Sequence, residues 1–152
     1  MRLTYLSYAF SLAMMYFSIV LLVPVIIAIV FHETDAILPF IISALTALFC
    51  AVMLRKIVKG SSQIKSINDI KKGEGLCVVS FSWIFAGLLT TIPYLFFDLS
   101  PINALFEGTS GITATGATIF TSFDYPKALF FWRSFSQWLG GMGIIVLFIA
   151  VL

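Results

Sequence analysis

Four long runs without a charged residue constrain this chain more than any other feature. They are each 19 to 29 residues long and cover 3–31, 36–54, 75–97 and 134–152. A helix needs about 20 apolar residues to cross the core of a bilayer, so all four runs qualify. Hydrophobic residues make up 61% of the sequence and charged residues only 11%, a balance that excludes an ordinary water-soluble domain. We therefore expect an all-α integral membrane protein with four transmembrane helices.

The first run is longer than a single crossing requires. It contains Pro24, which predicts a tilt or a kink in its outer third. A cleaved signal peptide has an apolar core of about 7–15 residues, far shorter than this run, so we expect a helix that is retained. With the second run it forms an N-terminal transmembrane hairpin over 1–54.

Basic residues gather in the linker 55–74, between the second and third runs. Asp69 and Glu74 are its only acids, against six basic residues: Arg55, Lys56, Lys59, Lys65, Lys71 and Lys72. Lysine and arginine accumulate on the cytoplasmic side of membranes, which places this linker and the N-terminus inside and the acidic turn at 32–35 outside. An anionic-lipid-binding patch is the alternative interpretation, although a role in topology is sufficient. We expect a multi-pass protein of the plasma membrane, which is the inner membrane of a bacterium.

A shorter helix is predicted between the third and fourth runs. Ser100 followed by Pro101 is a typical helix start, because the hydroxyl caps free N–H groups and proline suits the first helical position. The helix can extend to about Ile112, and roughly 12 residues rise only about 18 Å. It must dip into the membrane from outside and return, since the next charges, Asp124 and Lys127, are also interpreted as external. We expect a re-entrant pore helix.

The stretch after this helix is predicted to be a filter loop, Thr113-Ala114-Thr115-Gly116-Ala117-Thr118. Its small side chains let the backbone approach a pore axis, and Gly116 can adopt a positive φ. Irregular backbone at membrane depth is tolerated only where protein buries it or water fills the cavity beside it. The C-terminal end of the short helix favours a cation, and successive carbonyls can replace the hydration shell of that ion. The alternative is a polar loop that merely joins two helices.

The last run opens with a glycine-rich sequence. Gly140, Gly141 and Gly143 lower the helix propensity, and their expected role is close helix packing near the pore loop. Trp132 and Trp138 are interpreted as anchors at the membrane interface.

Arg133 is predicted to lie about two turns inside the external boundary of the membrane. A charge at that depth is costly, and it normally finds a partner or reaches back to the surface. Glu107 of the pore helix is one candidate for a buried ion pair, and Asp124 is another. The sequence alone does not choose between them.

Catalysis is not expected. An intramembrane enzyme needs a nucleophile with a base, or metal ligands on facing helices. His32 stands alone at the end of the first run, and no carboxylate pair lies within any run. Ser110 and Ser136 have no plausible base. We expect no enzyme, no cofactor and no nucleic-acid partner.

Two sequence segments resemble those of a known family. ALFEGTSGITATGATIF, at 104–120, is followed by WRSFSQWLGGMGIIVLFIAVL, at 132–152. Together they resemble the first pore-forming repeat of the Trk/Ktr/HKT potassium-uptake family, and above all the bacterial Trk-type membrane subunit. The hairpin 3–54 is similar to the extra N-terminal helices of such subunits. The resemblance implies that 75–152 is the first of four membrane–pore loop–membrane repeats around one pore.

The resemblance also implies a role for the filter loop. The backbone carbonyls of Ala114 and Thr115 would coordinate K⁺, Gly116 would be the filter glycine, and Thr113 and Ala117 would flank it. Potassium would be the transported substrate, and the lipid bilayer would surround the protein. A cytoplasmic nucleotide-binding regulatory subunit would gate the transporter.

The chain departs from the family because it contains a single filter segment and stops at 152, within or at the end of its last run. One repeat cannot surround an ion. We expect first a truncated or split gene product, or a subunit whose pore is completed by the remaining pore repeats on other polypeptides. A homotetramer, with four equivalent turns, is the alternative cation channel. The rival function is an inert or structural membrane fragment that transports nothing on its own.

Overall fold

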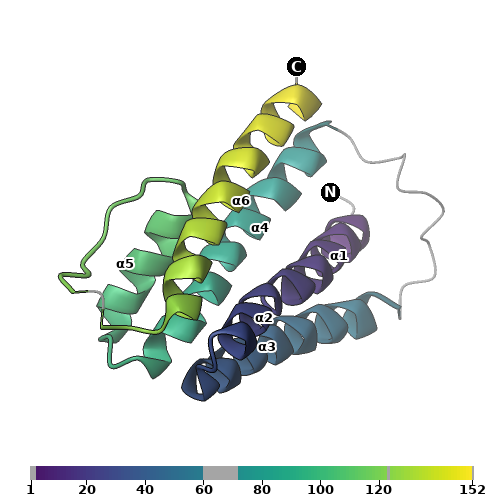
Figure 1. Ribbon diagram of the computed structural model, residues 1–152. Helices are drawn as coiled ribbons and strands as arrows, with labels where there is room; N and C mark the ends of the chain where they lie inside the picture. Colours follow the sequence, from purple (N-terminus) through teal and green to yellow (C-terminus); the bar gives the residue numbers. More distant parts are fainter. Residues whose placement is uncertain (1–2, 60–71, 123, 152) are drawn as a thin grey trace.

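The computed structural model describes residues 3–59, 72–122 and 124–151, and this part of the chain is helical, without strands. Figure 1 shows the elements, which are α1 (Leu3–Val20), α2 (Val23–Val30), α3 (Thr34–Lys59), α4 (Lys72–Thr91), the 3₁₀ helix η2 (Ile92–Phe96), α5 (Pro101–Ile112) and α6 (Lys127–Val151).

Three helical segments are long and apolar enough to cross a membrane: Ser7–Val30, Thr34–Lys56 and Val79–Phe96. They coincide with the first three predicted spans. The fourth predicted span lies in α6, a helix of 25 residues, whose side chains after position 145 are outside the described part of the chain. The predicted all-α membrane fold is confirmed.

The first span breaks where proline was expected to bend it. α1 ends at Val20, and Pro24 lies in the first turn of α2, where a missing N–H leaves no partner unsatisfied. In between, the N–H of Leu21 donates to the carbonyl of Phe17 at 3.0 Å. The N–H of Leu22 donates in turn to the carbonyl of Ile19 at 3.0 Å, so backbone hydrogen bonds continue into the bend, which a hydrocarbon environment favours.

Small residues fill the interface within the N-terminal hairpin. α1 lies mainly against α3, and the buried side chains of the hairpin include Ala28, Ala36, Ala44, Ala47 and Ala51. Small side chains let helix backbones approach closely in a membrane, where lipid is as apolar as the helices themselves. The buried hydroxyl of Ser43 donates to the carbonyl of Pro39 at 2.7 Å, so it needs no partner from another helix.

A tight turn joins α2 to α3. His32 has a φ of 57°, and the N–H of Glu33 donates back to the carbonyl of Ala28 at 2.8 Å. A left-handed residue followed by a bond to the fifth residue back is a common way to close the end of a helix. The turn leaves Glu33 half-buried at the end of the hairpin.

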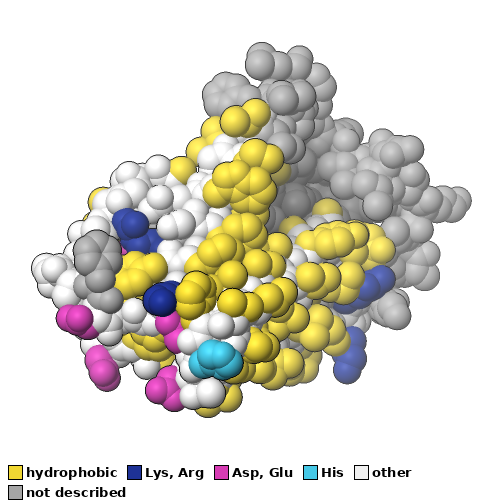
Figure 2. Space-filling view, in the orientation of Figure 1, with side chains coloured by type: hydrophobic (Ala, Val, Ile, Leu, Met, Phe, Trp, Pro, Cys, Tyr) yellow, Lys and Arg dark blue, Asp and Glu magenta, His cyan; other side chains and the backbone are white. Residues whose placement is uncertain are grey.

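The outer surface of the helices is apolar. On the face in view, Figure 2 shows a broad area of hydrophobic side chains over the middle of the described helices, with most charged side chains toward the edges. Several large residues are more than half exposed, among them Tyr16, Ile19, Ile26, Ile29 and Phe49. An apolar surface of this extent fits contact with lipid.

Part of the predicted basic linker, 60–71, lies outside the described residues. Its two ends are helical, because α3 continues to Lys59 and α4 begins at Lys72. In Figure 1 the labelled N- and C-termini lie toward the end of the molecule where α3 finishes and α4 begins, and the α2–α3 turn lies at the opposite end. This arrangement fits an even number of crossings.

The segment between η2 and α6 enters and returns at one end of the molecule. The hydroxyl of Ser100 accepts a hydrogen bond from the N–H of Asn103 at 3.3 Å, and Pro101 opens α5. After α5 the described residues of 113–126 form neither helix nor strand. Figure 1 shows this loop running back from the far end of α5 to the end where α5 began, where α6 starts.

Candidate ion-filter site

The short helix α5 lies close to its neighbours because two glycines share one of its faces. A Cβ at Gly108 would collide with Thr91 of α4, and a Cβ at Gly111 would lie 2.5 Å from the hydroxyl oxygen of Ser136 of α6. Residues three apart lie on the same side of a helix. The spacing of these glycines thus seats α5 between the two long helices.

The backbone reverses directly after α5. Ala114 has a φ of 56° and Gly116 a φ of 78°. The N–H groups of Ala114 and Thr115 donate to the carbonyls of Gly111 and Ser110, at 2.9 and 3.0 Å. A left-handed φ at alanine costs about 1–3 kcal/mol and persists only where the surroundings fix it, so these bonds hold the turn against strain.

A buried ion pair lies behind the turn. The Nε of Arg133 is 3.1 Å from Oε2 of Glu107, whose side chain is fully buried. The other carboxylate oxygen, Oε1, accepts bonds from the hydroxyl of Thr118 and the N–H of Ile119, both at 2.6 Å. Both oxygens of the buried carboxylate are therefore satisfied, as an ion pair removed from water requires. The structure thus brings Arg133 to Glu107, whereas the other candidate, Asp124, is exposed.

Arg133 also holds the turn itself. Its Nη2 donates to the carbonyl oxygens of Gly116 and Ala117, at 2.7 and 3.3 Å. The carbonyl of Ala117 accepts a further bond from the hydroxyl of Ser110, at 2.6 Å. The second half of the turn is therefore bonded to α5 and α6.

The first half of the turn is different. Residues 113 to 119 are all exposed, and within the described residues no hydrogen bond reaches the carbonyl oxygens of Thr113, Ala114 or Thr115. The Thr113 hydroxyl donates to the Thr109 carbonyl at 2.7 Å. Unpaired backbone carbonyls at membrane depth need a ligand, and a dehydrated cation is one that they suit.

The three glycines of α6 have different surroundings. A Cβ at Gly140 would collide with the carbonyl of Ile112, the last residue of α5, and one at Gly143 would lie 2.9 Å from the Trp83 ring. Nothing in the described part of the chain lies within 4 Å of a Cβ at Gly141. Gly140 thus lets α6 touch the end of the pore helix, and Gly141 has no such contact within this chain.

Trp132 is not an interface anchor. Its side chain is fully buried, its indole N–H donates to the carbonyl of Thr90 at 3.3 Å, and its ring meets those of Phe17 and Phe40 edge-on. The interpretation of this residue from the sequence was wrong, because tryptophan beside an apolar run is as compatible with a core as with an interface. Trp138 is 56% exposed.

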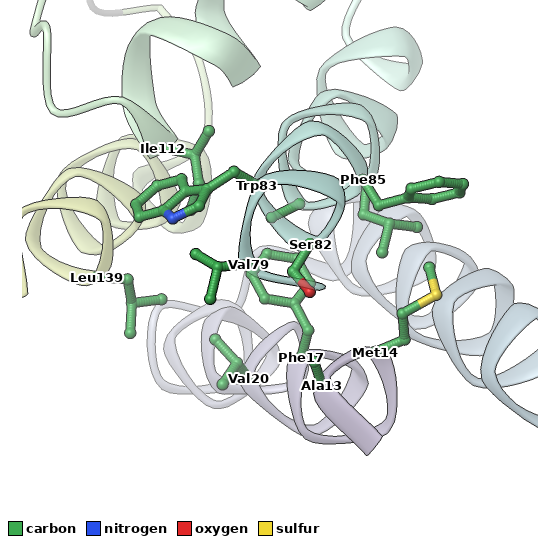
Figure 3. Close-up of a pocket in the computed structure, with 12 residues that line it drawn as sticks. Ala13, Met14, Phe17, Val20, Val79, Ser82, Trp83, Phe85, Ile112 and Leu139 are labelled. Carbon is green, nitrogen blue, oxygen red and sulfur yellow. The ribbon is translucent and has the colours of Figure 1, made fainter. Parts of the chain in front are cut away.

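An apolar cavity of about 400 Å³ lies behind the end of α5. Figure 3 shows Phe17, Trp83 and Leu139 around it, from α1, α4 and α6, and Ile112 at its edge. The residues that line it include no charged side chain. An ion would lose its hydration there without replacement, so this cavity is not a site for K⁺.

Sequence reasoning missed several residues that support the turn. Ser110 and Thr118 could have been suspected, because small hydroxyl residues in or beside a turn often bond neighbouring polar groups. The role of Glu33 could not have been suspected. Its carboxylate accepts hydrogen bonds from the N–H groups of Lys127 and Ala128, at 2.8 and 3.0 Å, which lie 94 and 95 residues away in the sequence. No local pattern predicts such a contact.

The fold places the chain first in a class: an all-helical membrane protein in which a short helix and an irregular turn lie between two longer helices. Residues 44–152 match the model of the family described as "TrkH: Cation transport protein". The chain belongs to this family, and the resemblance inferred from its sequence is confirmed.

Individual relatives agree with this family assignment. The chain is 34% identical over 140 residues to the Trk system potassium uptake protein TrkH of Vibrio parahaemolyticus, covering 90% of this chain and 28% of the relative. It is 40% identical over 92 residues to TrkH of Escherichia coli K12, covering 58% of this chain and 19% of that protein. The crystal structure of the potassium transporter TrkH from Vibrio parahaemolyticus superposes with a TM-score of 0.85 at 33% identity, over 100% of this chain and 32% of that one. The chain thus spans less than a third of the length of these relatives.

Proposed function

We propose that this chain forms part of the pore of a Trk-type potassium-uptake transporter, and that carbonyl oxygens of the turn at 113–117 coordinate the passing K⁺. The relatives are named as potassium uptake proteins, which makes transport rather than catalysis the activity to expect. The residue assignment depends on the exposed turn. Arg133 donates to the Gly116 carbonyl of this turn and is itself paired with Glu107.

The two halves of the turn have separate roles in this proposal. Thr113, Ala114 and Thr115 present the carbonyls that face the ion, because the described residues leave these oxygens without a hydrogen bond. Gly116 and Ala117 direct their carbonyls toward Arg133 and so set the curvature of the turn. The C-terminal end of α5 lies beside the same point, and its partial negative charge of about half an electron favours a cation there.

One turn cannot surround an ion, so further turns must complete the pore. The remaining repeats of a longer transporter are the favoured source, because the relatives extend well beyond the region matched by this chain. Other copies of the chain in a homotetramer are the second candidate, since fourfold symmetry would supply equivalent turns. The N-terminus and the 55–74 segment then face the cytoplasm, where a nucleotide-binding regulatory subunit would bind.

Growth at low potassium tests this function. The chain is expressed, alone and from its native gene region, in a bacterium whose own potassium-uptake systems are deleted. Rescue from the native region is expected. No rescue in either form, with the protein present in the membrane, would favour the inert or structural fragment.

Gly116→Ala tests the turn within this assay. No described residue lies within 4 Å of a Cβ at Gly116, but its φ of 78° disfavours any L side chain. We expect the substitution to reduce potassium uptake by about tenfold, because a strain of this kind costs about 1–3 kcal/mol. Gly73→Ala is the matched control, since its Cβ likewise meets no atom of the described residues, while its helical backbone accepts alanine. Equal uptake by both variants would contradict the filter assignment.

A further inference from the structure

We propose that Glu33, in the turn of the N-terminal hairpin, is a positioning residue for the ion filter, acting through the N-terminus of α6. This inference rests on the proposed function, and it assigns a role in selectivity to the N-terminal hairpin. It is built from three contacts that lie within the first two turns of α6.

The first contact is the cap of α6. The Glu33 carboxylate accepts the N–H groups of Lys127 and Ala128, one on each oxygen, at 2.8 and 3.0 Å. The next two N–H groups, of Leu129 and Phe130, donate to the carbonyl of Pro126. All four free N–H groups at the start of this helix are therefore satisfied, and two of them are bonded by a charged group from the hairpin. A carboxylate at this end is also favoured by the helix dipole.

The second contact adds an aromatic and cationic link to the same end. The Nζ of Lys127 lies 4.4 Å from the centroid of the Phe31 ring, two residues before Glu33. The backbone and the side chain of Lys127 thus both engage the α2–α3 turn. These bonds oppose rotation and sliding of α6 at its first residue.

The third contact links the position of α6 to the filter turn. Trp132 is buried between Phe17 of α1 and Phe40 of α3, and the next residue, Arg133, donates to the carbonyls of Gly116 and Ala117. A helix is stiff over two turns, so the Glu33 cap fixes the height and rotation at which the Arg133 guanidinium meets the turn. Loss of the cap should let these carbonyls relax while the ion pair with Glu107 stays intact.

The test compares Glu33→Gln and Glu33→Ala with Asp35→Ala. Asp35 lies two residues further on, in the first turn of α3, and is exposed. Among the described residues its carboxylate approaches the Thr34 hydroxyl alone, at 3.5 Å. Uptake of potassium in competition with sodium is measured in the protein expressed from its native gene region, at equal membrane abundance. We expect the preference for potassium to fall by about fivefold in Glu33→Ala, less in Glu33→Gln, and to stay unchanged in Asp35→Ala, which matches the typical strength of a helix-terminus contact.

A background carrying Arg133→Lys shows whether Glu33 acts through Arg133. Lysine keeps the charge but lacks the planar guanidinium that bonds the Glu107 carboxylate and the turn at the same time. If the effect passes through this guanidinium, Glu33→Ala changes selectivity less in the Arg133→Lys background than in the wild type. Equal changes in both backgrounds, or wild-type selectivity in Glu33→Ala, would overturn the proposal.

Hydrogen exchange separates this inference from the proposed function. Amide exchange at 114–119 is measured in the purified protein in lipid nanodiscs, without any transport. Faster exchange in Glu33→Ala than in Asp35→Ala is expected, and it supports the positioning role even if the wild type moves no potassium. Unchanged exchange overturns the positioning role even if the wild type is an active transporter.

Discussion

Arg133 serves two partners with one guanidinium group. Its Nε bonds the buried carboxylate of Glu107, while its Nη2 bonds the carbonyls of Gly116 and Ala117. A planar fork makes both contacts at once, which the compact ammonium of lysine would not reproduce. Glu107 needs this cation in return, because an unpaired charge at such depth is costly. The stability of the α5–α6 pair and the shape of the turn therefore depend on the same side chain.

Glu107→Gln should destabilise the chain strongly. Glutamine has the shape of glutamate and its amide oxygen still accepts from Thr118, but Arg133 then has no anionic partner, and breaking a buried pair costs about 3–5 kcal/mol. Thermal unfolding of the purified chain in detergent is the measurement. Asp124→Asn is the control, since Asp124 is exposed and its replacement should change little. Equal unfolding temperatures for the two variants would refute the role given to this pair.

The α6 helix is the element that brings the site together. Its first turn is capped by Glu33, its second carries Trp132 and Arg133, and Gly140 touches the end of α5. Along its length this helix therefore contacts the hairpin, the turn and α5 in succession. The packing of α6 decides where the filter turn lies.

Gly140→Ala and Gly141→Ala should differ sharply although the residues are adjacent. A methyl group at position 140 would overlap the carbonyl of Ile112, whereas at position 141 it meets open space within the described chain. Overpacking of this kind costs about 1–3 kcal/mol, while alanine in an open helical position is favourable by up to about 1 kcal/mol. The unfolding temperature of the chain in detergent is expected to fall for Gly140→Ala and to stay or rise for Gly141→Ala. The opposite order would show that α6 does not pack on Ile112.

The elements could be predicted from the sequence, but several contacts between them could not. Run lengths, Pro24 and the Ser100-Pro101 pair predict the spans, the break and the start of α5, because each is a local property of the backbone. The burial of Trp132 depends on Phe17 and Phe40, which lie far away in the sequence. The Glu33 cap joins residues separated by more than 90 positions. Such contacts are set by how the helices pack, and a single sequence contains no local signal of them.

At the scale of the whole molecule, the proposed function makes the chain one side of a pore. Its hairpin and long helices are packed with small residues and covered by apolar side chains, as a membrane domain requires. The turn at 113–119 is the exception, since it is polar and exposed. A polar backbone of this kind is stable in a membrane only beside protein or water. The relatives, of which this chain spans less than a third, extend beyond the matched region, which is where partners for the turn are to be sought.

The most direct test of this account is to locate the ion. Rb⁺ replaces K⁺ in the assembled transporter that contains this chain, and its anomalous scattering is mapped in crystals. We expect a peak within coordination distance of the carbonyl oxygens of Ala114 and Thr115, and its loss in Gly116→Ala. A fully occupied Rb⁺ site elsewhere in the pore, with no peak beside these carbonyls, would contradict the proposal that this turn binds the permeating ion.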